Sequence, residues 1–160
     1  MIEIPEDCLD TLQDQRLIRL LDYWRTKRGA APMPDPGAID PSDFKFILGY
    51  MSLVDVAHEP RRYYFRLDGS VLAALSGMDY TGKYLDQLGM PEYCAFVAAT
   101  YDKVVGSASP YAYRKRGAFD KASFSEETII LPLGTEGNVT RLMVAVIPGH
   151  HPGSQGKILI

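Results

Sequence analysis

The spacing of apolar residues near the start of the chain predicts an amphipathic helix. Four large apolar side chains recur at i, i+3, i+4 and i+7, which is the spacing of one helical face: Leu17, Leu20, Leu21 and Trp24. We expect the helix to cover residues 7–28, with Gly29 after its last turn. Three prolines within residues 32–36 then prevent a helix and predict an extended linker. The helix therefore needs another surface to cover its apolar face.

Alternating apolar and polar residues, interrupted by turn residues, predict strands and helices in the rest of the chain. Asp40 and Pro41 suit the N-cap and the first position of a short helix that ends near Gly49. We expect further helices at residues 69–76, 81–88 and 91–105, and strands at 50–57, 61–67, 109–119, 124–133 and 139–147. This order predicts the α+β class: a five-stranded antiparallel sheet with helices on one face and an N-terminal helical extension.

Four short motifs follow one another along the chain: LDYWR at 21–25, IDP at 39–41, FRLDGS at 65–70 and YTGK at 80–83. In this order they resemble a bacterial family of stand-alone PAS domains, which carries DYW, IDP, FRLxGT and LTG motifs. Ser70 stands where that family usually has Thr, and Tyr80 where it usually has Leu. The resemblance covers about residues 17–147 and implies a PAS fold with a sensory or regulatory role.

The expected domain organisation follows from the linker and from this resemblance. Residues 1–37 hold the N-terminal helix and the proline-rich linker, residues 38–148 the PAS domain, and residues 149–160 a tail. Because the helix is separated from the domain by the linker, we expect its apolar stripe to form the interface of a homodimer. The alternative is that the helix folds back onto its own sheet.

The resemblance also implies where a ligand would bind, because PAS domains place their cavity between the sheet and the helices that cover it. The expected lining is mostly apolar: Phe65, Leu72, Leu75, Tyr101, Tyr111, Tyr113, Leu131 and Met143. Either the even-numbered or the odd-numbered residues of 128–133 point inward, and the sequence leaves this open. Tyrosine hydroxyls would be the polar groups of the site, so the expected ligand is small, apolar, and uncharged or weakly acidic.

Composition and charge narrow the possible partners. The formal net charge of −3 argues against broad attraction to nucleic acid or to an anionic membrane. The start of the chain lacks the pattern of a signal peptide, and no apolar run reaches the roughly 18 residues of a membrane span, so we expect a cytoplasmic protein. Two cysteines, Cys8 and Cys94, fit a reducing compartment. The basic residues at 61–66 and 114–116 are expected to face solvent.

Residue types also argue against the cofactors that some PAS proteins carry. The helix at 91–105 has no histidine that would bind haem, and Cys94 lies outside the motif of flavin photoreceptors. His58 in a turn, and His150 and His151 in the tail, are expected to be exposed rather than catalytic or metal-binding. We therefore predict no haem, flavin or metal.

Three functions are consistent with the sequence. The favoured one is a non-catalytic sensory or signalling module that binds a small ligand, a protein partner, or both. The second is a small cavity enzyme, such as an isomerase or dehydratase, which would need a buried carboxylate with a shifted pKa. Asp68 and Glu127 are the candidates for that role, although Glu127 is expected to face solvent beside Glu126. The third function is a structural adaptor without a ligand.

Overall fold

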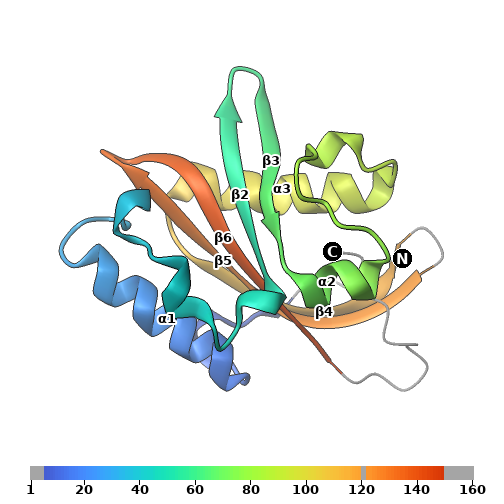
Figure 1. The fold of residues 1–160 in the computed structure, drawn as a ribbon, viewed down its shortest axis with the longest axis horizontal. Coiled ribbons are helices and arrows are strands. Elements are labelled where there is room, and N and C mark those ends of the chain that lie inside the picture. The colour runs from blue at the N-terminus through green and yellow to red at the C-terminus, as the bar shows by residue number, and fades with distance from the viewer. Residues whose placement is uncertain (1–5, 120–121, 150–160) are drawn as a thin grey trace.

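The structure, a computed structural model, describes residues 6–119 and 122–149. Within these residues, six strands form one antiparallel sheet in the order β1-β4-β5-β6-β2-β3 (Figure 1). The strands are β1 (Glu6–Asp7), β2 (Met51–His58), β3 (Arg61–Asp68), β4 (Tyr111–Phe119), β5 (Ala122–Thr135) and β6 (Asn138–Pro148). The α-helices are α1 (Gln15–Arg28), α2 (Ser70–Ser76) and α3 (Pro91–Ser107). The predicted α+β class is confirmed, and β1 adds a short sixth strand to the expected five.

The N-terminal helix begins later than predicted, at Gln15 rather than near residue 7. The side chain of Asp14 accepts a hydrogen bond from the backbone N–H of Arg16 at 2.9 Å and acts as the N-cap. Upstream of this cap, β1 pairs with the edge of β4, which keeps its backbone extended. Asp7, the first residue of the predicted helix, therefore belongs to a strand.

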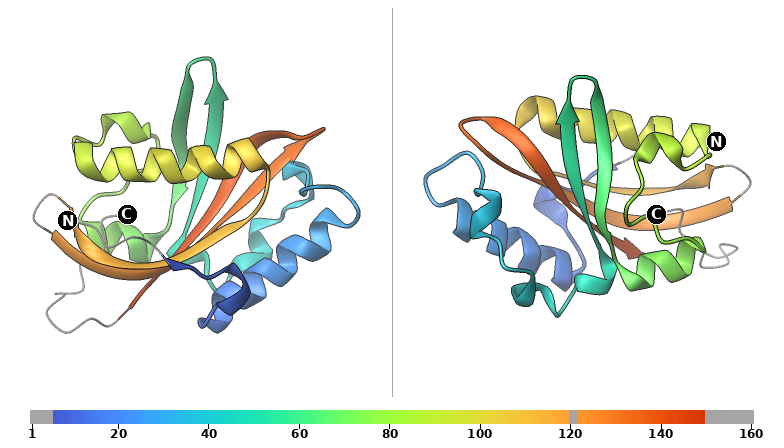
Figure 2. Two further views of the ribbon diagram at one scale, coloured as in Figure 1. Left: turned by 180° about the vertical axis from the view of Figure 1, so that it is seen from behind. Right: turned by 45° about the horizontal axis from the view of Figure 1, so that its top comes forward.

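Helices α1 and α3 cover opposite faces of the sheet. Tyr113 in β4 contacts the ring of Phe96 in α3, with a centroid distance of 6.1 Å. Its cross-strand neighbour in β5, Thr128, points to the same face, so the preceding residue Glu127 points to the other. Glu127 binds the backbone at the start of α1. Helix α3 lies behind β2 and β3 in Figure 1 and in front of them in the reverse view of Figure 2. The predicted N-terminal extension is thus a layer on the face opposite α3.

The apolar stripe of α1 is buried against the sheet of its own chain. The four side chains that form it are at most 4% exposed: Leu17, Leu20, Leu21 and Trp24. The indole N–H of Trp24 donates to the carbonyl oxygen of Pro132 in β5 at 2.8 Å. The linker returns to the same sheet, where the backbone N–H of Gly134 donates to the carbonyl oxygen of Pro34 at 3.0 Å. The structure therefore has the fold-back arrangement, and a dimer through this stripe would require α1 to leave its sheet.

The predicted N-cap at Asp40 is present in the structure, and a glycine of one sequence motif has a clear structural role. The side chain of Asp40 accepts from the backbone N–H of Ser42 at 2.9 Å and caps a short 3-10 helix, Pro41–Phe44. At the corner between β3 and α2, a Cβ on Gly69 would lie only 2.3 Å from the carbonyl oxygen of Gly49. Only glycine fits so close an approach of two backbone segments, which explains the glycine of the FRLDGS motif.

A buried carboxylate joins the start of α1 to the sheet. Glu127 accepts hydrogen bonds from the backbone N–H groups of Gln13 at 3.1 Å and Asp14 at 2.9 Å. It also accepts from Nε of Arg114 in neighbouring β4 at 2.8 Å. The Glu127 side chain is only 10% exposed, so the expectation that it faces solvent is wrong. Its three donors replace the water that an exposed carboxylate would bind.

We predict that Glu127→Ala lowers the free energy of unfolding by about 3 kcal/mol, because three donors lose a charged acceptor in a buried place. As a control, replacement of the exposed Glu92 of α3 by alanine should change it by less than about 0.5 kcal/mol. Urea unfolding, followed by the fluorescence of Trp24, the one tryptophan of the chain, measures both variants. Equal stabilities of the two variants would show that Glu127 does not hold α1 on the sheet.

Candidate functional site

Four of the eight residues predicted to line a pocket lie on the α3 side of the sheet. Tyr111 and Tyr113 share that face of β4 because they are two residues apart. Tyr101 of α3 contacts the ring of Tyr63 in β3, with a centroid distance of 5.1 Å. Phe65 shares the face of Tyr63 and is fully buried. Four predicted residues are therefore on the side of α3 where a PAS ligand would bind.

Leu131 and Met143 lie on the opposite face of the sheet, so their placement in the pocket lining is corrected. They are direct cross-strand partners in β5 and β6, on the side that carries Glu127 and α1. The inward residues of β5 are the even-numbered set: Thr128, Ile130 and Pro132. The two remaining predicted residues belong to α2, where Leu72 is fully buried and Leu75 is half-buried.

An ion pair is buried on the α3 side of the sheet. Lys115 in β4 is the direct cross-strand partner of Glu126 in β5, and its Nζ lies 2.9 Å from Oε1 of Glu126. Both side chains are 2% exposed. The ammonium group also lies 3.7 Å from the ring centroid of Phe96. Burial lowers the pKa of Lys115, although the charge of Glu126 acts in the opposite direction.

The sequence contained a signal for this buried pair that the prediction did not use. Lys115 was expected to face solvent with the other basic residues of 114–116, and this expectation is wrong. Tyr111, Tyr113 and Lys115 alternate along β4, so a strand places all three on one face. The cluster formed by Lys115, Glu126, Tyr113, Tyr101 and Asp68 is called the interior cluster below.

The tyrosines of the interior cluster are uncharged hydrogen-bonding groups. Burial raises the pKa values of Tyr101 and Tyr113 above the usual range of a phenol. The carboxylates of Asp68 and Glu126 raise the pKa of Tyr101 further. Nζ of Lys115 lies 3.4 Å from the hydroxyl of Tyr113, whereas the hydroxyl of Tyr101 has no hydrogen-bond partner within the described residues.

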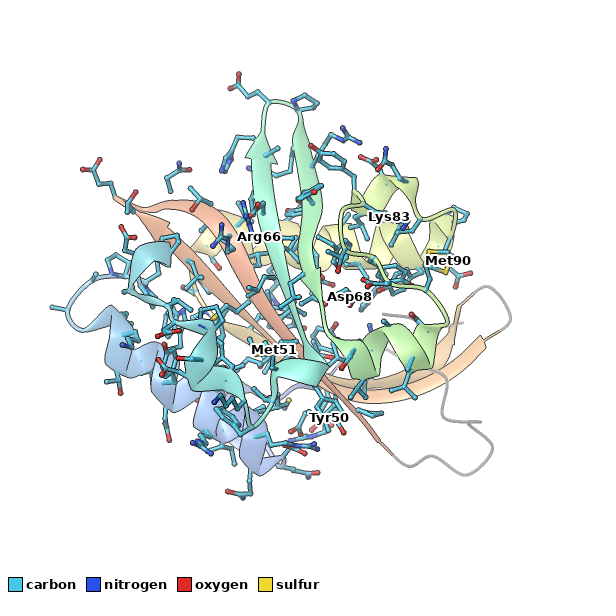
Figure 3. The ribbon with its side chains drawn as sticks, viewed as in Figure 1. Tyr50, Met51, Arg66, Asp68, Lys83 and Met90 are labelled. Atoms are coloured by element: carbon cyan, nitrogen blue, oxygen red, sulfur yellow. The ribbon has the colours of Figure 1, made fainter. Side chains whose placement is uncertain are left out.

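Asp68 is a buried carboxylate with defined partners. It lies at the end of β3, next to the start of α2 (Figure 3), and is 5% exposed. Its two oxygens accept from the hydroxyl of Ser52 at 3.1 Å and from the backbone N–H of Tyr80 at 3.0 Å. Its own N–H donates to the hydroxyl of Thr81 at 3.0 Å. Burial raises the pKa of Asp68, and the hydrogen bonds oppose this effect.

The basic residues of β3 lie outside this site and are neutralised locally. Arg62 forms two hydrogen bonds of 2.8 Å with the carboxylate of Asp86. Arg66, whose side chain is 54% exposed, pairs with Asp55 at 2.7 Å. Their solvent exposure agrees with the sequence-based expectation, and their pairing removes the unbalanced charge that a docking patch for an acidic partner would need.

His58, the one histidine of the described residues, and Cys94 each contact a backbone carbonyl oxygen. Nε2 of His58 lies 2.8 Å from the carbonyl oxygen of Val139. The thiol of Cys94 donates to the carbonyl oxygen of Leu85 at 3.1 Å, and burial raises the pKa of Cys8 to about 11. His150 and His151 lie outside the described residues.

No group of three or more His, Cys, Asp or Glu side chains in the described part of the chain has the arrangement of a metal site. None of the helices in residues 6–119 and 122–149 is both long and apolar enough to pass through a membrane.

Comparison with models of known protein families matches residues 12–147 to the family described as PAS domain. The match extends from just before α1 to the end of β6 and covers most of the chain. No curated protein and no solved structure matches the chain. The match confirms the predicted PAS domain, and α1 is part of the region that matches.

We predict that Lys115→Met alone lowers the free energy of unfolding by about 3–5 kcal/mol, because Glu126 loses its counter-ion in a buried place. The double variant Lys115→Met/Glu126→Gln should recover most of that loss, since no buried charge is left unpaired. Urea unfolding of both single variants and the double variant gives the coupling free energy. Additive losses would contradict a direct interaction between the two side chains.

The raised pKa of Asp68 predicts a pH dependence with a defined sign. The folded protein holds the Asp68 proton more tightly than the unfolded chain, whose pKa is 3.8. The contribution of Asp68 to stability is therefore full below that value and is lost as pH rises through the folded pKa. Relative to Asp68→Asn, the wild-type protein should lose stability as the pH rises above 3.8 and through the folded pKa of Asp68. Urea unfolding at several pH values tests this, and a difference that is constant with pH would refute it.

Proposed function

Because this chain belongs to the PAS domain family, we propose that it is a sensory module whose signal is a small ligand held between α3 and the sheet. Membership of the family supports a sensory or regulatory role in general. The observation that carries the ligand proposal is the buried pair of Lys115 and Glu126. A buried ion pair adds little stability compared with apolar residues of similar size. Its presence on the side where a PAS ligand would bind therefore favours a role in recognition.

The contacts of the buried carboxylates favour binding over catalysis. Both oxygens of Asp68 accept hydrogen bonds from Ser52 and Tyr80, and Glu126 is paired with Lys115. A general base must reach a proton of the substrate, and these carboxylates are already engaged. Glu127, the other carboxylate considered from the sequence, is bound to the start of α1 on the opposite face. We therefore favour the sensory module over the cavity enzyme as the proposed function.

Strand β5 offers a route by which the proposed signal would leave the site. Glu126 belongs to the interior cluster, and the next residue, Glu127, holds the start of α1 on the other face. Suppose that a ligand binds more tightly when the Glu126 side chain is in one of two conformations. Because Glu126 and Glu127 are consecutive residues of β5, such a ligand would also change how stably Glu127 holds α1 on the sheet. We further propose that the output is contact with a protein partner in the cytoplasm, with a homodimer as the simplest assembly.

A screen of small molecules by thermal shift tests the proposed site. Ligands that bind only the folded protein should raise the melting temperature of the wild type, by an amount that grows with ligand concentration. The same compounds should not stabilise Lys115→Met/Glu126→Gln. They should still stabilise the control Arg62→Met/Asp86→Asn, which removes an exposed ion pair on the surface. Equal stabilisation of both variants would place the site elsewhere, and a screen without any ligand for the wild type would favour the structural adaptor.

A further inference from the structure

We propose that the site accepts a small, uncharged aromatic molecule with an N–H or O–H group, and that the hydroxyl oxygen of Tyr101 accepts its hydrogen bond. This inference rests on the proposed function, because it names the ligand class of the same site. The sequence alone suggests an uncharged or weakly acidic ligand, and the proposed ligand class is narrower because it excludes carboxylates.

The hydroxyl group of Tyr101 is buried and has no hydrogen-bond partner within the described residues. Tyr101 is 2% exposed, and its oxygen makes no hydrogen bond within the described residues. Folded proteins pair almost all such groups, because an unpaired buried hydroxyl destabilises the native state. This hydroxyl lies on α3, on the side of the sheet where a PAS ligand would bind. A ligand that supplies its hydrogen bond accounts for a group that the fold leaves unpaired.

The charged groups around the Tyr101 hydroxyl are mainly carboxylates. Asp68 and Glu126 lie close enough to Tyr101 to disfavour its ionisation, and the positive charge of Lys115 is held by Glu126 at 2.9 Å. A carboxylate bound next to Tyr101 would face Asp68 without a counter-ion of its own. A cation would have to leave water for a fully buried place. An uncharged N–H or O–H donor avoids both costs and suits an oxygen in a negative environment.

Aromatic rings lie next to Tyr101 and on the same side of the sheet. The ring of Tyr63 meets the ring of Tyr101 edge-on at 5.1 Å between centroids. On the same side of the sheet, Phe96 and Tyr113 form another edge-on pair at 6.1 Å. Rings of this kind favour flat aromatic partners in offset or edge-on contact. The ligand class is therefore an aromatic ring with one donor group rather than an aliphatic chain.

Four compounds of similar size separate the relevant chemistries: benzamide is uncharged with an N–H donor, acetophenone is uncharged without one, benzoate is an anion and benzylamine a cation. Ligand-observed NMR titrations on the full chain measure their dissociation constants. We expect benzamide to bind most tightly, and Tyr101→Phe to weaken it at least about fivefold through the loss of one hydrogen bond. Tyr64→Phe, whose ring packs on Tyr84, is the matched control and should bind benzamide as the wild type does.

The stability of Tyr101→Phe gives an independent test. Removal of an unpaired buried hydroxyl should leave the melting temperature unchanged or raise it, so a clear decrease would show that the hydroxyl has a structural partner and would overturn the proposal. Preference for benzoate, or equal binding of benzamide by wild type and Tyr101→Phe, would overturn the ligand class and leave the sensory proposal intact. A broad screen that finds ligands, none of which is an uncharged aromatic molecule with a donor group, would likewise overturn the ligand class and leave the sensory proposal intact. A screen that finds no ligand at all would remove the ligand proposal and this inference together.

Discussion

Strand β5 is buried on both of its faces, and the rest of the structure depends on this constraint. Ile129, Ile130 and Leu131 are all fully buried, although successive side chains of a strand point to opposite sides. One set needs the cover of α3 and the other the cover of α1. Without α1, the second face would expose a continuous apolar surface on β5 and β6, which a soluble protein rarely tolerates. The N-terminal helix is therefore part of the hydrophobic core and not an appendage to it.

The two neighbouring carboxylates of β5 fix the strand in its register. Glu126 meets Lys115 on the α3 side, and Glu127 meets Arg114 on the α1 side. A slip of one residue between β4 and β5 would turn each side chain to the other face and separate both pairs. Since a buried charge without a partner is strongly unfavourable, the charges select one register where the apolar residues of β5 alone would accept either face.

The sequence predicted the parts of the fold that depend on local patterns. The order of the elements after the linker and the N-cap at Asp40 both have short-range signals. The start of α1 was misplaced because β1 is held by β4, more than 100 residues away in the chain. The inward face of β5 could not be chosen, because both faces are apolar and periodicity carries no information in such a strand. Two pocket residues, Leu131 and Met143, were misplaced for that reason.

Burial of charge was the other feature that sequence reasoning missed. Lys and Glu are almost never fully buried unless they are paired, so exposure is the reasonable expectation for Lys115 and Glu127 taken singly. Each becomes buried only because a partner stands directly opposite on a neighbouring strand or at the start of α1. Such pairing depends on the register of β4 and β5, which is a property of the folded sheet. Alternation along β4 nevertheless placed Lys115 on the face of Tyr111 and Tyr113.

The two faces of the sheet differ in how completely their polar groups are paired, and this difference separates stability from function. On the α1 side, Glu127 has three donors and the indole N–H of Trp24 has a carbonyl partner. Within the described residues, none of the buried polar side-chain atoms that lack a hydrogen-bond partner lies on that side. On the α3 side, the chain retains a buried ion pair, which apolar residues often replace without loss of stability, and a Tyr101 hydroxyl that has no partner within the described residues. Selection for stability alone would not retain both features, so their presence on the side where a PAS ligand would bind supports the proposal that a ligand is recognised there.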